Sequence, residues 1–231
     1  ATGTFEFKTG KYKVKGNFVN GLPDGLFEEY YEDGSIMAKE NFVNGEMTSK
    51  ELFYKNGNLL GNFTENDDIK LYYDDGSLIL SYDAEKEESI YYHENGNPLM
   101  IGNSYETTLY NENNEVLFET VNGQSIDTKK TFKELEDGTF EILKDNKIIA
   151  KVDAKGETLT YLYSTGEVLM VSNTASENTE IFFKNGQTFF IVNGVNSRFY
   201  YKDGKLLYES NNGEWKFFDR EGKQIMSNFE E

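Results

Sequence analysis

The stretch Tyr30-Tyr31-Glu32-Asp33-Gly34-Ser35-Ile36 decides the fold, because its pattern recurs along most of the chain. Two aromatic residues precede a variable residue, an Asp or Asn, a Gly, and in most copies an aliphatic residue two positions later. Further copies stand at residues 53–59, 72–78, 182–188 and 200–206, and looser copies end at Gly96, Gly166 and Gly222. A fixed period of roughly 20 residues predicts an array of small, similar units, which presents surfaces more readily than it houses catalysis.

Turns between the expected strands fall into two alternating classes. Asp-Gly and Asn-Gly beside aromatic and β-branched residues indicate hairpins, because a type I′ turn needs positive φ at both central positions. The first class falls at Gly34, Gly57, Gly76, Gly96, Asn114, Asn146, Gly166, Gly186, Gly204 and Gly222, and the second at Gly21, Gly45, Gly123, Gly194 and Gly213. A turn every ~8–12 residues leaves strands of about five to six residues.

The predicted fold is therefore all-β: an elongated, single-layer antiparallel β-meander of about ten hairpin repeats. Very little helix is expected, because no longer segment keeps a helical period. Residues 1–231 are interpreted as a single repeat array, with N-terminal repeats at 10–110, an irregular or degenerate stretch at 111–150, and C-terminal repeats at 151–231.

Strand parity separates two faces of the meander. Counted back from each turn Gly, the third and fifth positions share one face and are almost wholly apolar, as in Tyr73 with Leu71. The fourth and sixth positions combine an aromatic residue with a charge, as in Tyr72 with Lys70. We call these the packed face and the mixed face. The pattern predicts that Tyr54, Tyr73 and Tyr201 are more buried than Phe53, Tyr72 and Tyr200.

Composition excludes several classes of partner and chemistry. A formal net charge of −18 argues against nucleic acid and against direct binding to anionic membranes, both of which require excess Lys and Arg. The chain has no Cys, and no apolar run approaches the ~20 residues of a membrane helix. The chain uses few Arg and many Lys and Asn. This bias is typical of an AT-rich coding sequence, and it favours a bacterial source.

Candidate catalytic residues are scarce. His93 is the only histidine, and its place in a Tyr-Tyr-x-x-Asn-Gly hairpin predicts a surface residue near a turn. Without Cys and with one His, neither an ordinary catalytic triad nor an ordinary zinc site can be assembled. Acidic pairs such as Asp67-Asp68 and Asp74-Asp75 are explained by turn chemistry. We expect no enzyme activity, no catalytic or metal-binding residues, and no cofactor.

Aromatic side chains on the mixed face are the best binding candidates. The predicted set is Tyr30, Phe53, Tyr72, Tyr91, Phe182 and Tyr200. One interpretation is that they stack on each other across strands and stiffen the sheet. The other is that they form an acid-rimmed aromatic surface for a protein, peptide or glycan. The two interpretations can coexist.

At these residues the chain resembles the MORN repeat family, specifically its second bacterial variant, found in proteins labelled antitoxin-like by similarity. The clearest copy runs from Asn17-Phe18-Val19-Asn20-Gly21 through Gly25 to Tyr31-Glu32-Asp33-Gly34, and a second runs from Asn41 to Gly57. The resemblance covers 10–108 and 155–225, although the inner Gly at Gly25 is mostly lost in later units. It implies protein–protein contact, membrane attachment or exposure on a bacterial surface.

The sequence thus predicts a non-enzymatic binding or scaffold protein, at the bacterial cell surface or secreted, whose mixed face contacts a basic or neutral protein or peptide. The alternative is an intracellular, cytoplasmic antitoxin-like protein that neutralises a cognate partner. A glycan- or cell-wall-binding module is a third possibility, but its choline-binding form requires Trp-rich cages, and the chain has one Trp. The oligomeric state is left open.

Overall fold

The computed structural model describes residues 1–9, 12–126 and 129–228. Within these ranges it contains strands and turns and no helix, so the predicted all-β meander is confirmed. Residues 10, 11, 127, 128 and 229–231, which the predicted repeat ranges include, lie outside the described residues. Packing divides the chain into two compact units, described in turn below.

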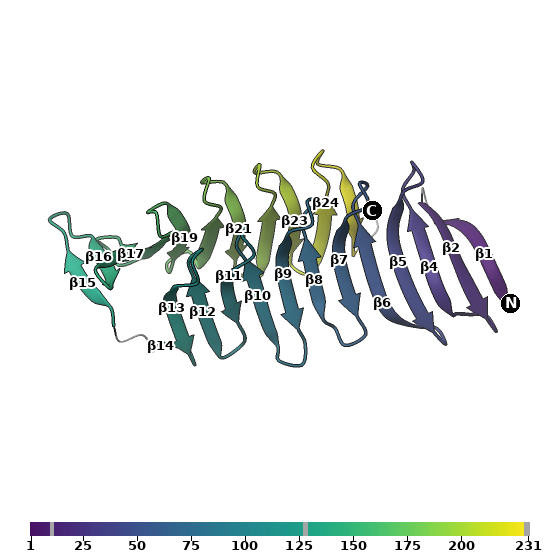
Figure 1. The fold of residues 1–231 in the computed structure, drawn as a ribbon, viewed down its shortest axis with the longest axis horizontal. Coiled ribbons are helices and arrows are strands. Elements are labelled where there is room, and N and C mark those ends of the chain that lie inside the picture. The colour runs from purple at the N-terminus through teal and green to yellow at the C-terminus, as the bar shows by residue number, and fades with distance from the viewer. Residues whose placement is uncertain (10–11, 127–128, 229–231) are drawn as a thin grey trace. The chain divides into compact units, whose positions relative to one another are not determined.

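The first unit comprises Ala1–Tyr92 and Met100–Ser104. Its strands are β1 (Gly3–Thr9), β2 (Tyr12–Val19), β3 (Leu22–Pro23), β4 (Gly25–Tyr30), β5 (Ile36–Val43), β6 (Glu46–Phe53), β7 (Leu59–Thr64), β8 (Ile69–Tyr72), β9 (Leu78–Asp83) and β10 (Glu88–Tyr92). From β1 to β10 each strand pairs antiparallel with the next, except that the short β3 pairs only with β2 and β4 follows β2 in the sheet (Figure 1). This is the order of a meander.

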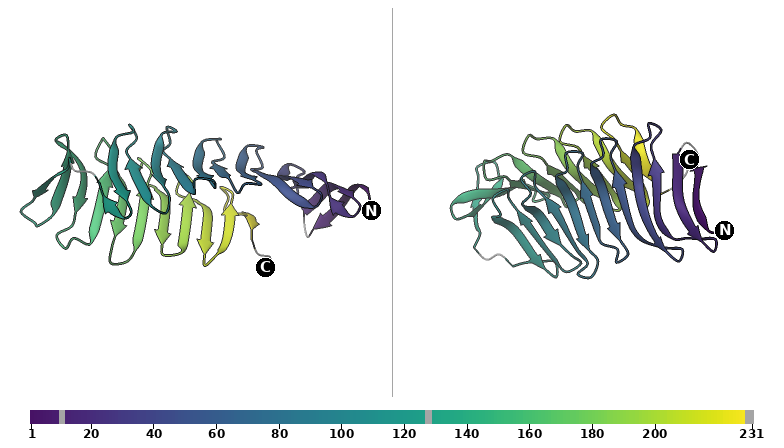
Figure 2. Two further views of the ribbon diagram at one scale, coloured as in Figure 1. Left: turned by 90° about the horizontal axis from the view of Figure 1, so that it is seen from below. Right: turned by 45° about the vertical axis from the view of Figure 1, so that its right-hand side comes forward.

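The second unit comprises His93–Leu99 and Tyr105–Glu231. From the first part of the chain it contains β12 (Glu106–Tyr110), β13 (Val116–Val121) and β14 (Gln124–Ser125), while β11 (Pro98–Gly102) has residues in both units. Its other sheet consists of β15 (Thr131–Glu134), β16 (Phe140–Lys144), β17 (Lys147–Val152), β18 (Thr158–Leu162), β19 (Val168–Asn173), β20 (Asn178–Phe182), β21 (Thr188–Asn193), β22 (Asn196–Tyr200), β23 (Leu206–Asn211), β24 (Glu214–Phe218) and β25 (Gln224–Ser227). These strands pair in chain order, and Figure 2 shows them as a second sheet in green to yellow. The change of sheet after β14 falls inside the stretch predicted to be irregular.

In the second unit, side chains from the two sheets meet, so this part of the meander has two layers where the sequence predicted one. The rings of Phe118 on β13 and Tyr161 on β18 lie 5.9 Å apart. Within the second sheet, Phe190 and Phe199 are directly opposed and stack with ring centroids 4.5 Å apart. The aromatic packed face therefore supplies the core of this unit.

The turns differ in conformation, which corrects the prediction of type I′ turns throughout. At the first-class turn after Tyr31, only Gly34 has positive φ (87°), and its amide donates to the Tyr31 oxygen at 2.9 Å. The register of β4 and β5 shifts just before this turn, between Glu29 and Tyr30. This is a type I turn that ends in a left-handed Gly beside a bulge. At the second-class turn, Asn44 and Gly45 both have positive φ (52° and 92°), as type I′ requires.

The predicted separation of the two faces is confirmed. Tyr54 and Tyr73 are 4% exposed and Tyr201 is 0% exposed, whereas their chain neighbours Phe53, Tyr72 and Tyr200 are partly exposed. Period-2 alternation places each such pair on opposite faces of one strand. The packed face carries the core, and the aromatic residues of the mixed face remain accessible.

Close packing in the first unit explains one glycine. The rings of Phe18 and Phe27 meet edge to face at 5.3 Å, and Phe27 in turn meets Phe42 at 5.0 Å. Gly16 lies beneath the ring of Phe27, where a Cβ atom would come within 2.3 Å of the ring carbons. Only a residue without a side chain leaves room for this ring.

Candidate binding surface

A row of alternating charges crosses the mixed face of the first unit. Glu6, Lys15, Glu28, Lys39 and Glu51 are successive directly opposed partners on β1, β2, β4, β5 and β6. Opposite charges that face each other across strands stabilise a sheet and fix its register. The interior of this face is therefore balanced in charge, although the whole chain is strongly acidic.

Opposed charges also occur towards both ends of the second sheet, although the row between them is uncharged except for Glu180. Lys133, Glu141 and Lys151 are opposed in register on β15, β16 and β17. Near the other end of the sheet, Glu209 on β23 is opposed to Arg198 on β22, with the Arg198 Nε 3.6 Å from the Glu209 carboxylate. Cations and anions therefore alternate strand by strand in the first unit, and only over short runs of strands in the second sheet.

The predicted aromatic residues of the mixed face each lie beside a first-class turn. In register they face a residue of the same hairpin: Tyr30 faces Ile36, Phe53 faces Leu59, Tyr72 faces Leu78, Phe182 faces Thr188, and Tyr200 faces Leu206. Lysines approach two of the rings, with Lys13 Nζ 5.7 Å from the Tyr30 centroid and Lys39 Nζ 5.5 Å from that of Phe53. These rings are partly exposed, and their binding role stays a prediction.

Tyr91 does not belong to this set, which corrects its predicted placement. It is opposed to Leu80, which is opposed in turn to the buried Leu71 on the packed face. The reason is parity, because Tyr91 lies five residues before Gly96 and the mixed-face position is four residues before it. Tyr92 takes that position, and its hydroxyl lies 3.0 Å from the Ser81 hydroxyl.

Hydroxyl groups from the packed face hold the backbone that carries the mixed-face aromatic residues. In each case the tyrosine before a first-class turn donates to a main-chain oxygen one repeat further on. The pairs are Tyr31 to Phe53 (2.7 Å), Tyr54 to Tyr72 (2.9 Å), Tyr163 to Phe182 (2.7 Å) and Tyr201 to Phe218 (2.9 Å). We call this set the hydroxyl ladder. It fixes the spacing between repeats and the backbone at Phe53, Tyr72 and Phe182.

His93 occupies a ladder position in the second unit and is 7% exposed, so the prediction of a surface residue is wrong. Its Nε2 donates to the Tyr110 oxygen at 3.1 Å, as a tyrosine hydroxyl does in other repeats. Its ring lies 5.8 Å from that of Tyr163 on the other sheet. Burial lowers the pKa of His93, although the hydrogen bond to Tyr110 and the charge of Glu112 oppose this effect.

Glu112 joins the two sheets of the second unit at the turns. Its carboxylate accepts hydrogen bonds from the Ser164 hydroxyl at 2.6 Å and the Lys184 ammonium at 3.0 Å. Burial raises the pKa of Glu112, but these hydrogen bonds outweigh it and lower the pKa to about 2. No sequence signal points to this residue, because its partners lie 52 and 72 positions away.

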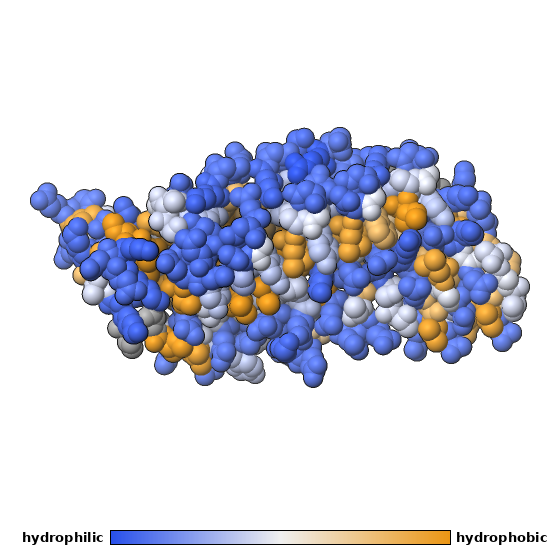
Figure 3. Space-filling view, in the orientation of Figure 1, coloured by the Kyte–Doolittle hydropathy of each residue, from blue (hydrophilic) through white to orange (hydrophobic). Residues whose placement is uncertain are grey.

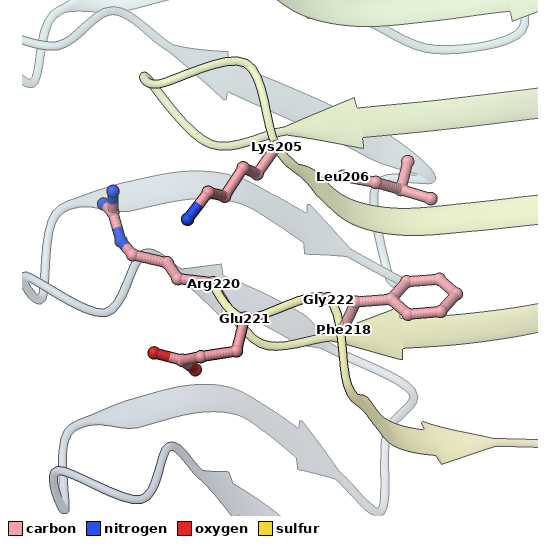
Figure 4. Close-up of a pocket in the computed structure, with 6 residues that line it drawn as sticks. All are labelled: Lys205, Leu206, Phe218, Arg220, Glu221 and Gly222. Carbon is pink, nitrogen blue, oxygen red and sulfur yellow. The ribbon is translucent and has the colours of Figure 1, made fainter.

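Two hollows open beside aromatic residues of the mixed face. One, of about 410 Å³ in the second unit, is lined by Lys205, Leu206, Phe218, Arg220, Glu221 and Gly222. In Figure 4, Lys205 and Arg220 extend on the turn side, and Leu206 and Phe218 point the other way. The other, of about 530 Å³ in the first unit, is lined by Glu6, Lys8, Lys13, Lys15, Tyr30, Tyr31, Glu32 and Gly34.

Figure 3 shows a mostly hydrophilic face with hydrophobic residues in separate patches. Among the residues that the structure describes, no group of His, Asp or Glu is arranged to hold a metal ion. The same residues include no helix long and apolar enough to cross a membrane.

Comparison with solved structures finds similar chains of low identity. The TCP10 domain of Danio rerio CPAP, in complex with a peptide of Danio rerio STIL, is 18% identical with a TM-score of 0.29 and covers 98% of this chain and 99% of that chain. The G-box domain of the microcephaly protein CPAP is 16% identical with a TM-score of 0.27, and the match covers 99% of this chain and 100% of that chain. The Photorhabdus luminescens Tc holotoxin pore is 10% identical with a TM-score of 0.24, and the match covers 97% of this chain and 16% of that chain.

A search of curated proteins gave no match to this chain. A family model described as a MORN repeat variant matches residues 23–44 and 194–211. The first segment runs from β3 to the turn after β5, and the second from the turn after β21 to the end of β23. The resemblance seen in the sequence is confirmed over these two segments, which match the model of a MORN repeat variant.

Proposed function

We propose that this is a non-enzymatic binding or scaffold protein that contacts a protein or peptide through its mixed face. One observation in the first unit carries the proposal: the rings of Phe53 and Tyr72 stay partly exposed while the hydroxyl ladder fixes the backbone beneath them. Tyr and Phe provide large contact areas with few rotatable bonds, so a rigid row of such rings binds at low entropic cost.

The expected partner is extended and basic or neutral overall. An extended segment places alternate side chains on one face, at a spacing that suits the row of alternating charges in the first unit. The net charge of −18 attracts cationic partners at long range and repels acidic ones. Association should slow as salt rises, because the Debye length is only ~8 Å at physiological ionic strength.

The expected location is the bacterial cell surface or the exterior, and it is supported by the resemblance to MORN-variant repeats. Protease treatment of intact cells that express the natural gene tests it. Cleavage of the protein on intact cells agrees with the expectation. Full protection until lysis would contradict it and would favour the intracellular antitoxin-like alternative.

A peptide selection tests the binding role. Random peptides are selected on the wild-type protein, and each is then measured against Phe53→Ala combined with Tyr72→Ala. The matched control is Tyr105→Ala, which removes a ring that is 66% exposed outside the predicted set. We expect the double variant to bind selected peptides at least about ten-fold more weakly and the control to bind like the wild type. Peptides that bind both variants equally would contradict the proposal.

A further inference from the structure

Three lysines line the hollow at Tyr30, although the chain as a whole is acidic. The hollow lies where the mixed face of β1, β2 and β4 meets the turn at Gly34. Lys8 and Lys13 are directly opposed in register, and Lys15 lies two residues further along β2 on the same face. Like charges that face each other across strands are destabilising, so this arrangement has a cost that opposed Lys and Glu would avoid.

The acidic groups nearby offset these lysines only in part, although Glu6 and Glu32 also line the hollow and Glu6 and Glu28 are opposed to Lys15 in register. Glu6 lies 3.0 Å from Lys13 Nζ, and Glu28 accepts a hydrogen bond from the Tyr30 hydroxyl at 2.7 Å. Within the described part of the chain, Lys8 and Lys15 have no ion-pair partner. Both side chains are exposed. Two ammonium groups at the wall of the hollow thus remain available to an anion.

Tyr30 gives the hollow an apolar side. Its ring faces Ile36 across the hairpin, and Lys13 Nζ lies 5.7 Å from the ring centroid. The hydrogen bond to Glu28 holds the ring in place, and the same bond is the main reason that the pKa of Tyr30 is raised. A ligand here meets ammonium groups on one side and an aromatic ring on the other.

We propose that this hollow binds a carboxylate side chain of an extended peptide, with an apolar residue of the same segment against Tyr30. The inference rests on the proposed function, because the hollow is one part of the mixed face. The bound carboxylate accepts hydrogen bonds from Lys8 and Lys15, which are stronger than those between neutral groups. The site would anchor an acidic residue of the partner and set the register in which the partner lies along the sheet.

The overall negative charge does not prevent such binding. Beyond a Debye length of ~8 Å at physiological salt, the distant carboxylates are largely screened. The lysines at the hollow lie in contact with the ligand and are not screened in this way. The chain therefore attracts cationic segments at long range, whereas this hollow selects one acidic side chain at short range.

Calorimetric titration with two synthetic hexapeptides tests the inference. In one, valine alternates with glutamate, and in the other glutamine replaces each glutamate. We expect the glutamate peptide to bind the wild-type protein at least about ten-fold more tightly than the glutamine peptide. Lys8→Gln combined with Lys15→Gln should remove this preference. The change relieves the repulsion between Lys8 and Lys13 but removes the charge that Lys15 places opposite Glu6 and Glu28, so the melting temperature should change little.

The charge-matched control is Lys70→Gln combined with Lys155→Gln, which removes two exposed lysines outside the hollow. It should keep the preference for glutamate. Three results would overturn the inference. The first is that both double variants lose the preference for glutamate equally, and the second is that the wild type shows no such preference. The third is that acetate, at an equal concentration of carboxylate, displaces the glutamate peptide completely. The proposed function is judged separately by Phe53→Ala with Tyr72→Ala, whose positions do not line the hollow.

Discussion

The hydroxyl of Tyr54, buried on the packed face, donates to the backbone oxygen of Tyr72 at 2.9 Å. Tyr54 precedes the first-class turn of one repeat, and Tyr72 carries a mixed-face ring in the next. One bond thus links the core of one repeat to the exposed aromatic position of its neighbour. Because the link recurs, the packed face determines where the mixed-face rings stand.

Replacement of Tyr54 by Phe tests this link. The variant keeps the ring and removes the donor, so the Tyr72 oxygen loses its partner inside the protein. We expect the free energy of unfolding to fall by about 1 kcal/mol, measured by urea denaturation. Tyr105→Phe is the control, because Tyr105 is 66% exposed and outside the ladder. A loss as large in the control would show that the hydroxyl ladder does not stabilise the array.

His93 should make stability depend on pH near neutrality. Burial lowers its pKa below the ordinary value of 6.5, so the unfolded state binds a proton more readily than the folded state. This contribution is fully present above pH 6.5 and is lost as pH falls from 6.5 through the lowered pKa. We expect the melting temperature to fall over this interval. The groups that face the ring are the backbone of Tyr110 and Asn111, the charge of Glu112 and the ring of Tyr163.

The variant His93→Tyr places a hydroxyl at this ladder position and removes the only titrating imidazole of the chain. We expect it to fold, to match or exceed the wild-type melting temperature at pH 5.5, and to show a weaker pH dependence between 5 and 7. A pH dependence unchanged from that of the wild type would refute the assignment to His93.

Glu112 should protect the second unit against acid. Its pKa is lowered from 4.5 to about 2, so its contribution is present above pH 4.5 and is lost as pH falls from 4.5 to about 2. Glu112→Gln should lower the melting temperature at pH 7 and flatten the dependence below pH 4.5. Glu157→Gln at an exposed turn residue is the control. If both variants melt alike, Glu112 does not hold the sheets together.

Gly76 tests the first-class turns without steric complication. Its φ is +85°, and a Cβ atom there would meet no atom within 4 Å. Replacement by Val should therefore cost only the strain of a left-handed residue, about 1 kcal/mol or more. Thermal melting should show a larger loss for Gly76→Val than for Ser77→Val at the next position. Equal losses would mean that this turn does not need glycine.

Local patterns in the sequence predicted the strands, the meander and the buried tyrosines, because strand parity and hairpin turns depend on neighbouring residues. Parity also predicts burial of His93, which lies three residues before Gly96, but its polar side chain favoured the surface. The turn type after Tyr31 was missed because Asp-Gly suits both a type I′ turn and a type I turn with a bulge. Glu112 was missed because its contacts join residues from different sheets, and no periodicity encodes that pairing.

Photo-crosslinking tests the central claim, that the mixed face is the binding surface, most directly. A photoreactive phenylalanine analogue is placed at Phe53, at Tyr72 or at Tyr105, and each protein is irradiated with a peptide obtained by selection on the wild type. We predict cross-links from Phe53 and Tyr72 and none from Tyr105. Cross-links from Tyr105 alone, with none from the two mixed-face positions, would contradict the claim.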